Sequence, residues 1–369
     1  MENLGVSVSL LGYGCMRFPT LPDGKIHRAA AEELLDRAIK SGVNYFDTAY
    51  PYHNGESEPF VGDAMSKYPR SSFFLATKMP PWAVNTKEDI PALFEKQLER
   101  LKTDYIDFYL LHAMDAEKWK KMKGLGAVEY LESRQREGKI RFLGFSFHDS
   151  YEVFEEILNS RSWDFCQIQL NYMDAGEQAG VKGLELAEKK GIPVVVMEPV
   201  KGGLLAKLPA DISASLSAVT PGRSDASWAM RYVASFPNVK VILSGMSDMT
   251  QLEDNINTFS PFSPLTPDER KALERAVATM RSRIKNPCTG CGYCMPCPNG
   301  VEIPRNFRVW NGFGVYGNSG VAGSAYREIK EGARADACIG CGECLDKCPQ
   351  KIDIPSDLAR MKDDAEEWK

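Results

Sequence analysis

The sequence predicts an α/β fold: a (β/α)8 barrel, also called a TIM barrel, followed by a small cysteine-rich domain. Two observations support this prediction. Short apolar runs alternate with segments of helical periodicity eight times along the chain, a pattern that takes ~250 residues in such barrels. After that series, eight of the ten cysteines gather in two short runs. We therefore expect one large apolar core, followed by a domain organised around its cysteines.

The first apolar run ends at Gly12 and Gly14, which leave room for a ligand beside the backbone. The strands are expected at residues 10–16, 43–46, 73–78, 105–112, 140–146, 165–170, 193–197 and 239–243. Their helices are expected at residues 27–40, 56–67, 87–101, 127–137, 151–158, 181–190, 225–234 and 251–257. The first of these helices ends at Ser41-Gly42, a common carboxyl-terminal signal.

A further helix is expected at residues 267–284, and there the alternation stops. The composition then shifts toward cysteine, glycine and proline. We therefore expect a barrel domain at residues 1–265, a connecting helix at 266–285 and a second domain at 286–369.

The amino-acid composition indicates which kinds of binding partner to expect. The chain has 369 residues, 43% of them hydrophobic, and 45 basic against 50 acidic side chains give a net charge of -5. Without a long basic run, nucleic acid and anionic membrane surfaces are not expected as partners, and small-molecule chemistry is. The amino terminus lacks the pattern of a leader segment, and no run of ~18 apolar residues is present. We therefore expect a cytoplasmic protein.

Polar side chains follow three successive expected strands, where each apolar run ends. Asp47 ends the second run, with Tyr52 just beyond it. Lys78 ends the third run, and His112 ends the fourth. The carboxyl ends of barrel strands meet at one mouth, where active sites lie. Tyrosine has a pKa of about 10, so a catalytic Tyr52 requires a cation or a hydrogen-bond donor beside it to stabilise the phenolate. Each of these residues alone has an ordinary structural explanation.

The surroundings of these four residues resemble the aldo-keto reductase family. Typical phrases are Phe-Asp-Thr-Ala at 46–49, Asn-Gly-Glu-Ser-Glu at 54–58 and Asp-Tyr-Ile-Asp-Phe-Tyr-Leu-Leu-His at 104–112, and the resemblance covers residues 10–259. It implies that Asp47, Tyr52, Lys78 and His112 form a catalytic tetrad. It also implies reduction of a small carbonyl compound by hydride from NADPH or NADH, with Tyr52 as general acid.

The resemblance also implies residues on the cofactor side. Ser146 matches a serine that usually precedes an asparagine in contact with the nicotinamide amide, although Phe147 replaces that asparagine here. Gln167 matches the glutamine of the same site, and Gln169 could do the same job. Met197 stands where the family has an aromatic residue stacked on the nicotinamide ring. A methionine can also pack on a planar ring. Met16, Phe18, Trp82, Tyr172 and Met173 are candidates for a substrate pocket, or for ordinary loop packing.

The loops after the last two strands fit the phosphates of such a cofactor, because phosphate sites in barrels use these loops and a helix amino terminus. The residues concerned are Gly203, Ser244, Gly245 and Met246. The resemblance further implies that Gln251, Asp254 and Asn255 reach the adenine end. No arginine or lysine occurs from residue 244 to 255, so charge leaves NADP and NAD both open. The alternative explanation is a capped helix after a buried strand.

The cysteine runs have iron–sulfur spacing. Cys338-x2-Cys341-x2-Cys344-x3-Cys348-Pro349 is the bacterial ferredoxin run for a [4Fe-4S] cluster, and the run Cys288-x2-Cys291-x2-Cys294-x2-Cys297-Pro298 is one residue shorter. Zinc is the alternative, but zinc sites typically use separated Cys-x2-Cys pairs. We expect two clusters in a ferredoxin-like domain. In two-cluster ferredoxins the cysteine before proline binds the other cluster, so the expected ligand sets are Cys288, Cys291, Cys294 with Cys348, and Cys338, Cys341, Cys344 with Cys297.

Electron count raises an alternative function. A nicotinamide passes two electrons as hydride and each cluster passes one, so FMN or FAD in the barrel could link them, with a ferredoxin as electron partner. The clusters could instead have only a structural role and stabilise the fold of the small domain. A third hypothesis is a nucleotide-binding redox sensor without catalysis, against which the complete tetrad argues.

Overall fold

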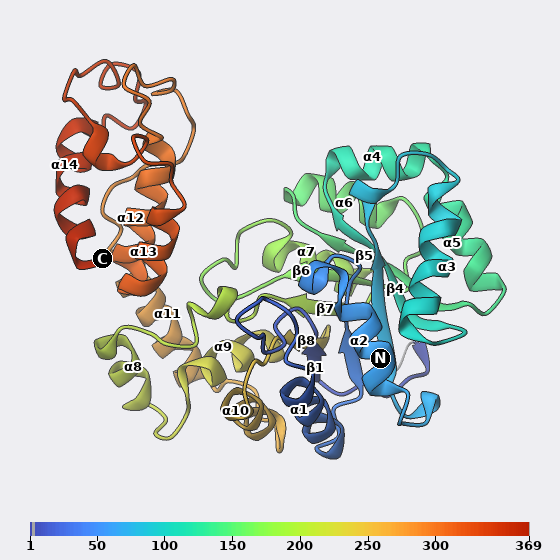
Figure 1. Cartoon of the computed structure of the whole chain (residues 1–369). Helices are drawn as coiled ribbons and strands as arrows, with labels where there is room; N and C mark the ends of the chain where they lie inside the picture. The colour runs from blue at the N-terminus through green and yellow to red at the C-terminus, as the bar shows by residue number, and fades with distance from the viewer. Residues whose placement is uncertain (2–3, 369) are drawn as a thin grey trace. The chain divides into compact units, whose positions relative to one another are not determined.

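The computed structural model describes residue 1 and residues 4–368. The chain divides into two compact units (Figure 1). The first contains Met1–Gly202 and Ala226–Leu265, and the second contains residues 203–225 and those from 266 onward. The expected division at residues 1–265, 266–285 and 286–369 stays a prediction about folding domains.

The first unit is a closed barrel of eight parallel strands in chain order, which confirms the predicted fold (Figure 1). Each strand pairs with the next in sequence, and β1 also pairs with β8. The strands are β1 Leu11–Gly14, β2 Tyr45–Asp47, β3 Phe74–Met79, β4 Ile106–Met114, β5 Ile140–Phe147, β6 Phe165–Gln169, β7 Val194–Met197 and β8 Val239–Ser244. Their carboxyl ends form one mouth.

Helices connect the strands of the first unit. They are α1 Arg28–Lys40, α2 Ser57–Met65, α3 Asp89–Leu101, α4 Ala116–Gly124, α5 Ala127–Arg136, α6 Tyr151–Asn159, α7 Gly180–Lys189, α9 Asp225–Ala234 and α10 Met249–Phe259. The lysine-rich α4 was not among the expected helices; only Trp119 and Met122 of it are buried. Among the described residues, no helix combines the length and apolar character that crossing a membrane requires.

Alternation along the strands separates two apolar layers. Tyr45 and Val195 belong to the cluster inside the barrel, whereas their neighbours Phe46 and Val196 pack in the layer under the helices. Successive strand side chains point to opposite faces, so every second residue enters the interior. Gly144 makes room there, because a Cβ on it would lie 2.6 Å from the Phe165 carbonyl oxygen.

The second unit is helical. It contains α8 Ala210–Ser217, α11 Pro267–Arg281, α12 Ile303–Tyr316, α13 Ser319–Arg327 and α14 Ile354–Ala365. Figure 1 shows α12, α13 and α14 grouped near the cysteine-bearing loops. Both α12 and α14 begin at an isoleucine followed by proline, shortly after a cysteine run. Ile303 and Ile354 share a small core with Phe307 and Leu358. The repeat visible in the sequence is therefore also a structural repeat.

Candidate active site and cysteine hollows

Asp47 and Lys78, at the ends of β2 and β3, form a buried ion pair. Lys78 Nζ lies 2.6 Å from Asp47 Oδ1 and donates a second hydrogen bond of 2.7 Å to the Thr48 carbonyl oxygen. The Lys78 side chain is fully buried. Burial alone lowers the pKa of Lys78, but Asp47 and Tyr52 outweigh it and hold that pKa above its usual value. Lys78 is therefore a cation at the barrel mouth.

Tyr52 begins a 3-10 turn, Tyr52–Gly55, just beyond β2, and is partly exposed. Lys78 Nζ lies 5.1 Å from the centre of its ring. Burial raises the pKa of Tyr52, while the charge of Lys78 and a hydrogen bond from it oppose that rise. The phenol thus carries its proton at neutral pH. His53 and Asn54 take left-handed φ values of 51° and 55°, a strained geometry common at functional sites.

A β-bulge sets the position of His112. The pairing of β4 with β5 shifts register between Leu111 and Met114. Within the bulge, Ala113 has a φ of 51°, and its N–H donates to Ser146 Oγ at 2.7 Å. Bulges re-aim side chains at barrel rims. Ser146 on β5 thereby fixes the backbone next to His112.

The His112 ring stands among the other mouth residues. Its centre lies 6.1 Å from that of Tyr52, edge to face, and 5.0 Å from that of Trp82. Trp82 is 48% exposed. Burial lowers the pKa of His112 well below its usual value, and the charge of Lys78 adds to the effect. His112 Nδ1 is buried and has no hydrogen-bond partner in the described part of the chain. The imidazole is therefore neutral.

The structure brings the four expected tetrad residues to one mouth, together with the expected cofactor-side residues of β5, β6 and β7. Ser146 pairs in register with Gln167. Gln167 Nε2 lies 3.5 Å from Met197 Sδ, and in the described residues its buried Oε1 has no partner. An unpaired buried acceptor is costly unless a donor reaches it. Phe147 instead turns outward and packs 5.3 Å from Phe154.

The expected phosphate loop follows β8. Asn255 Nδ2 donates to Ser244 Oγ at 2.7 Å, and both residues are buried. The Met246 side chain is fully buried, and its carbonyl oxygen accepts from Tyr13. Only Gly245 of these residues is exposed. The neighbouring loop residues Ser247 and Asp248 are exposed as well.

The adenine-side residues lie on α10, whose amino terminus Asp248 caps. Gln251 Oε1 accepts from the Ser247 N–H at 2.9 Å, so its amide belongs to this capped turn. The Asp254 carbonyl oxygen accepts from Thr258. The capped helix weighed as an alternative is therefore present. Gly203 belongs to the second unit and has a φ of 100°.

Arg17 is a residue that inspection of the β8 loop alone misses. A Cβ on Gly245 would lie 2.7 Å from Arg17 Cγ, so the arginine stem lies against this glycine. Ser247 Oγ donates to the Arg17 carbonyl oxygen at 2.8 Å. Arg17 is exposed. A cation therefore reaches the β8 loop from the β1 loop, and no sequence signal links the two positions.

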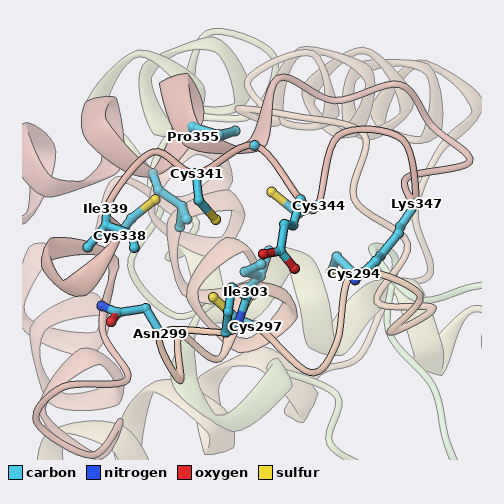
Figure 2. A pocket seen from close by; sticks show the side chains of 14 residues that line it. Cys294, Cys297, Asn299, Ile303, Cys338, Ile339, Cys341, Cys344, Lys347 and Pro355 are labelled. Carbon is cyan, nitrogen blue, oxygen red and sulfur yellow. The ribbon is translucent and has the colours of Figure 1, made fainter.

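The cysteines of the second unit line two hollows. Figure 2 shows the first, which is lined by Cys294, Cys297, Cys338, Cys341 and Cys344. The second is lined by Cys288, Cys291, Cys294 and Cys348. The second hollow thus receives three cysteines of one run and the pre-proline cysteine of the other, and the first receives the corresponding set with Cys294 in addition. Cys294 and Ile303 line both.

Burial and crowding affect the thiols that line the two hollows. Burial raises the pKa of Cys294 and Cys344, and neighbouring cysteines add to the rise, so their thiolates require a compensating cation. In the described residues, no three His, Cys, Asp or Glu side chains gather as ligands of one ion. Ligands of a cluster bind separate iron atoms. Cys15 and Cys166 are fully buried strand residues.

Gly292 and Gly342 shape the loops around the hollows. They take φ values of 78° and 79°, in equivalent positions of the two runs. These left-handed values favour glycine. The loops thereby turn tightly between the cysteines of each run.

The barrel with this mouth defines an oxidoreductase of the (β/α)8 class. The sequence matches the model of the aldo/keto reductase family over residues 10–278. The chain therefore belongs to the aldo-keto reductase family, as predicted. Residues 287–352 match a 4Fe-4S dicluster domain.

Known proteins resemble the barrel part. The chain is 30% identical over 306 residues to an uncharacterized oxidoreductase of Bacillus subtilis, YqkF, covering 74% of this chain and 95% of that protein. It is 27% identical to an NADH-specific methylglyoxal reductase of Escherichia coli, over 54% of this chain and 66% of that one. The holo form of aldo-keto reductase AKR11C1 from Bacillus halodurans superposes with a TM-score of 0.62 at 28% identity, covering 73% and 93% of the two chains.

Proposed function

We propose that the barrel reduces a small carbonyl compound with hydride from NADPH or NADH, with Tyr52 as the general acid. The observation that carries this proposal is the buried Lys78 ammonium, 2.6 Å from Asp47 and beside the Tyr52 ring. Such a cation lowers the cost of the tyrosinate that forms when Tyr52 gives up its proton.

Each tetrad residue has a separate task. Tyr52, protonated at neutral pH, donates its proton to the carbonyl oxygen, and Lys78 stabilises the phenolate left behind. Asp47 keeps Lys78 charged and in place. Neutral His112 orients the substrate oxygen by a hydrogen bond. The nicotinamide, when bound, supplies the hydride.

Several groups on the cofactor side of the mouth could contact a bound nicotinamide cofactor. The unpaired Gln167 Oε1 fits the amide N–H of a nicotinamide, and Met197 offers an apolar contact to its ring. The Gly245 backbone and the Arg17 cation suit the phosphates. Both NADPH and NADH are compatible with this arrangement.

The substrate class follows from the mouth. Trp82 packs on His112 and remains 48% exposed, so an apolar face adjoins the proton-donating centre. The name of the Escherichia coli relative, a methylglyoxal reductase, agrees with a small dicarbonyl or aldehyde. We expect compounds of this kind as substrates.

For the second unit we propose two [4Fe-4S] clusters with crossed ligands. Cys288, Cys291, Cys294 and Cys348 would hold one, and Cys338, Cys341, Cys344 and Cys297 the other. The grouping of cysteines around the two hollows supports this assignment. Because Cys294 and Ile303 line both hollows, single electrons can pass between the clusters.

That adjacency favours a second candidate function, exchange of electrons between the clusters and a ferredoxin. The comparisons give no support for FMN or FAD. Oxygen-free protein mixed with a chemically reduced ferredoxin tests this candidate. Loss of the visible cluster absorption would support it, whereas unchanged absorption would leave the clusters a structural role.

Replacing Tyr52 with Phe tests the barrel proposal. Tyr52→Phe should reduce kcat for aldehyde reduction by about 10²- to 10⁴-fold while leaving NADPH binding unchanged. Tyr50→Phe is the matched control, since the Tyr50 ring lies under Arg100 at 4.4 Å and has no proposed role. Equal activity of the two variants would refute Tyr52 as the acid, and an inactive parent would favour the sensor hypothesis.

Paired cysteine variants test the crossed ligands. The parent should contain about eight iron atoms. If Cys297 and Cys341 serve one cluster, the double variant Cys297→Ser/Cys341→Ser should retain about four. Cys297→Ser/Cys291→Ser should then lose both clusters. The opposite result would show that each run binds its own cluster.

A further inference from the structure

Behind the mouth, where β3 and β4 meet α2 and α3, lies a closed polar cluster to which the proposed reaction gives no role. Glu58, Thr77, Gln97 and Tyr109 are all fully buried there. Glu58 Oε1 accepts hydrogen bonds from Gln97 Nε2 at 2.6 Å and from Thr77 Oγ1 at 2.7 Å. Its other oxygen accepts from Arg100 at 3.2 Å. The carboxylate thus collects donors from β3 and α3.

Gln97 connects this cluster to the strand that carries Lys78. Its Nε2 donates to the Lys78 carbonyl oxygen at 3.0 Å. Its Oε1 accepts from the Tyr109 hydroxyl at 2.5 Å, and Tyr109 lies on β4, the strand of His112. Gln97 therefore joins the backbone of Lys78 to both Glu58 and the neighbouring strand.

Ser57, beside Glu58 at the start of α2, secures the other side of the ion pair. Its hydroxyl donates to the Cys15 carbonyl oxygen at 3.1 Å and shares a hydrogen bond of 2.8 Å with Thr48 Oγ1. The Thr48 carbonyl oxygen is in turn an acceptor for the Lys78 ammonium. The first two residues of α2 thus tie β1, β2 and β3 together around that ammonium.

Gly62 permits this arrangement. A Cβ at Gly62 would lie 2.4 Å from the Arg100 carbonyl oxygen and 2.8 Å from the Leu101 carbonyl carbon. Both atoms are backbone and cannot move aside cheaply. The absence of a side chain lets α3 approach α2 closely enough for Gln97 and Arg100 to reach Glu58.

Burying a carboxylate costs several kcal/mol unless it is well paired. Burial indeed raises the pKa of Glu58, and its hydrogen bonds with Gln97, Thr77 and Arg100 oppose that rise. An apolar side chain could fill the same volume without this cost. We infer that Glu58 and Gln97 are positioning residues that fix Lys78 against Asp47 and Tyr52, an inference that rests on the proposed reduction.

Asp107 provides a matched control. It is also a buried carboxylate of the barrel, but it lies at the opposite end of β4, away from the mouth. It pairs with Arg70 at 2.7 Å and accepts from the Leu75 N–H at 3.0 Å. A purely structural carboxylate should behave as Asp107 does when neutralised.

The test compares Glu58→Gln with Asp107→Asn. Glu58→Gln should lower kcat by about 10- to 100-fold, the scale of a misplaced catalytic group, and leave NADPH affinity and carbonyl KM unchanged. Asp107→Asn should lower the melting temperature without lowering kcat. Gln97→Met repeats the test if Glu58→Gln does not fold. Equal kcat in both carboxylate variants would overturn the inference.

The Lys78 ammonium gives a readout independent of activity. In ¹⁵N-lysine-labelled protein its proton resonances should be visible in the parent and in Asp107→Asn, because Asp47 and Thr48 hold it. They should broaden or shift in Glu58→Gln. An inactive parent with these spectra would refute the proposed reduction alone, whereas identical spectra in all three proteins would refute the positioning role.

Discussion

The barrel mouth and the cysteine hollows hold their reactive side chains in different ways. At the mouth, Lys78 finds its countercharge and acceptors in the protein itself, from Asp47 and Thr48. In the hollows, burial and neighbouring cysteines raise the pKa of Cys294 and Cys344, and the iron proposed to bind there would supply the countercharge for their thiolates. The ion pair at the mouth is therefore formed within the protein, whereas we expect the cysteine hollows to need a bound metal.

The apolar cores around the two sites also differ, because the core around the mouth is large and the core beside the hollows is small. Eight strands and their helices enclose the mouth in large apolar layers. The core beside the hollows is small, and residues such as Ile303 and Ile352 both belong to it and line the hollows. Small cores commonly need metals for stability. The cofactor of the second unit is therefore expected to be part of its fold.

Removing iron should produce the largest effect. With anaerobic chelation, we expect α12 and α14 to lose nearly all amide protection, while β1 to β8 keep theirs, because the core of the second unit is small and adjoins the hollows. Hydrogen exchange read by mass spectrometry measures both regions in one sample, so the barrel serves as the internal control. If the amides of α12 and α14 stayed protected from exchange after iron removal, the second unit would not depend on its metal for folding.

Breaking the ion pair should affect stability and activity separately. Lys78→Met leaves a buried charge on Asp47 and should destabilise the barrel by about 3–5 kcal/mol. Adding Asp47→Asn removes that charge and should restore most of the stability. Activity should remain about 10²- to 10⁴-fold reduced in both variants. Denaturant unfolding and kcat measure the two effects; a Lys78→Met variant as stable as its parent would contradict a buried pair.

The pH profile of carbonyl reduction should show that Tyr52 stays protonated and His112 stays neutral throughout the neutral range. Tyr52 must be protonated to act, and its raised pKa means that this form is lost only as pH rises above about 10. His112, with its lowered pKa, stays neutral until the pH is well below about 6.5. We expect kcat/KM for reduction to be flat between these limits. A midpoint near pH 7 would show that either group titrates normally.

The smallest effect is expected from substitution of Arg17, at the edge of the proposed phosphate site. Arg17→Ala should raise the Kd for NADPH by roughly 3- to 10-fold, as for a partly solvated contact to phosphate, with kcat unchanged. The effect should shrink in high salt. Arg28→Ala is the control, because Arg28 pairs with Asp63 at 2.7 Å on the outer helices. Equal affinities of the two variants would exclude Arg17 from the phosphate site.

The sequence determined the fold class and most of the mouth, because both follow from local periodicity. Asp47, Lys78 and His112 each stand an even number of residues along their strand from an interior residue, as Asp47 does from Tyr45 and His112 from Leu110. Alternation therefore places all three on the interior face. Side chains of one parity at strand ends must face the barrel axis. Cysteine spacing similarly determined which thiols can share a site. These features need no knowledge of distant contacts.

Parity also explains Phe147. Ser146 has the interior parity and Phe147 the opposite one, so the phenylalanine joins the outer layer beside Phe154. The substitution that stood out in the sequence therefore lies away from the mouth. This outcome could have been derived from the strand alone.

Tertiary structure alone decided the contacts between distant segments. Arg17 reaches Gly245 only because barrel closure places β1 beside β8. Glu58 and Gln97 meet because two helices approach at a glycine. Periodicity fixes the face on which a side chain lies, but loop conformation and helix packing set its partners. The sequence thus determined which residues could react, and the fold determined what holds them in position.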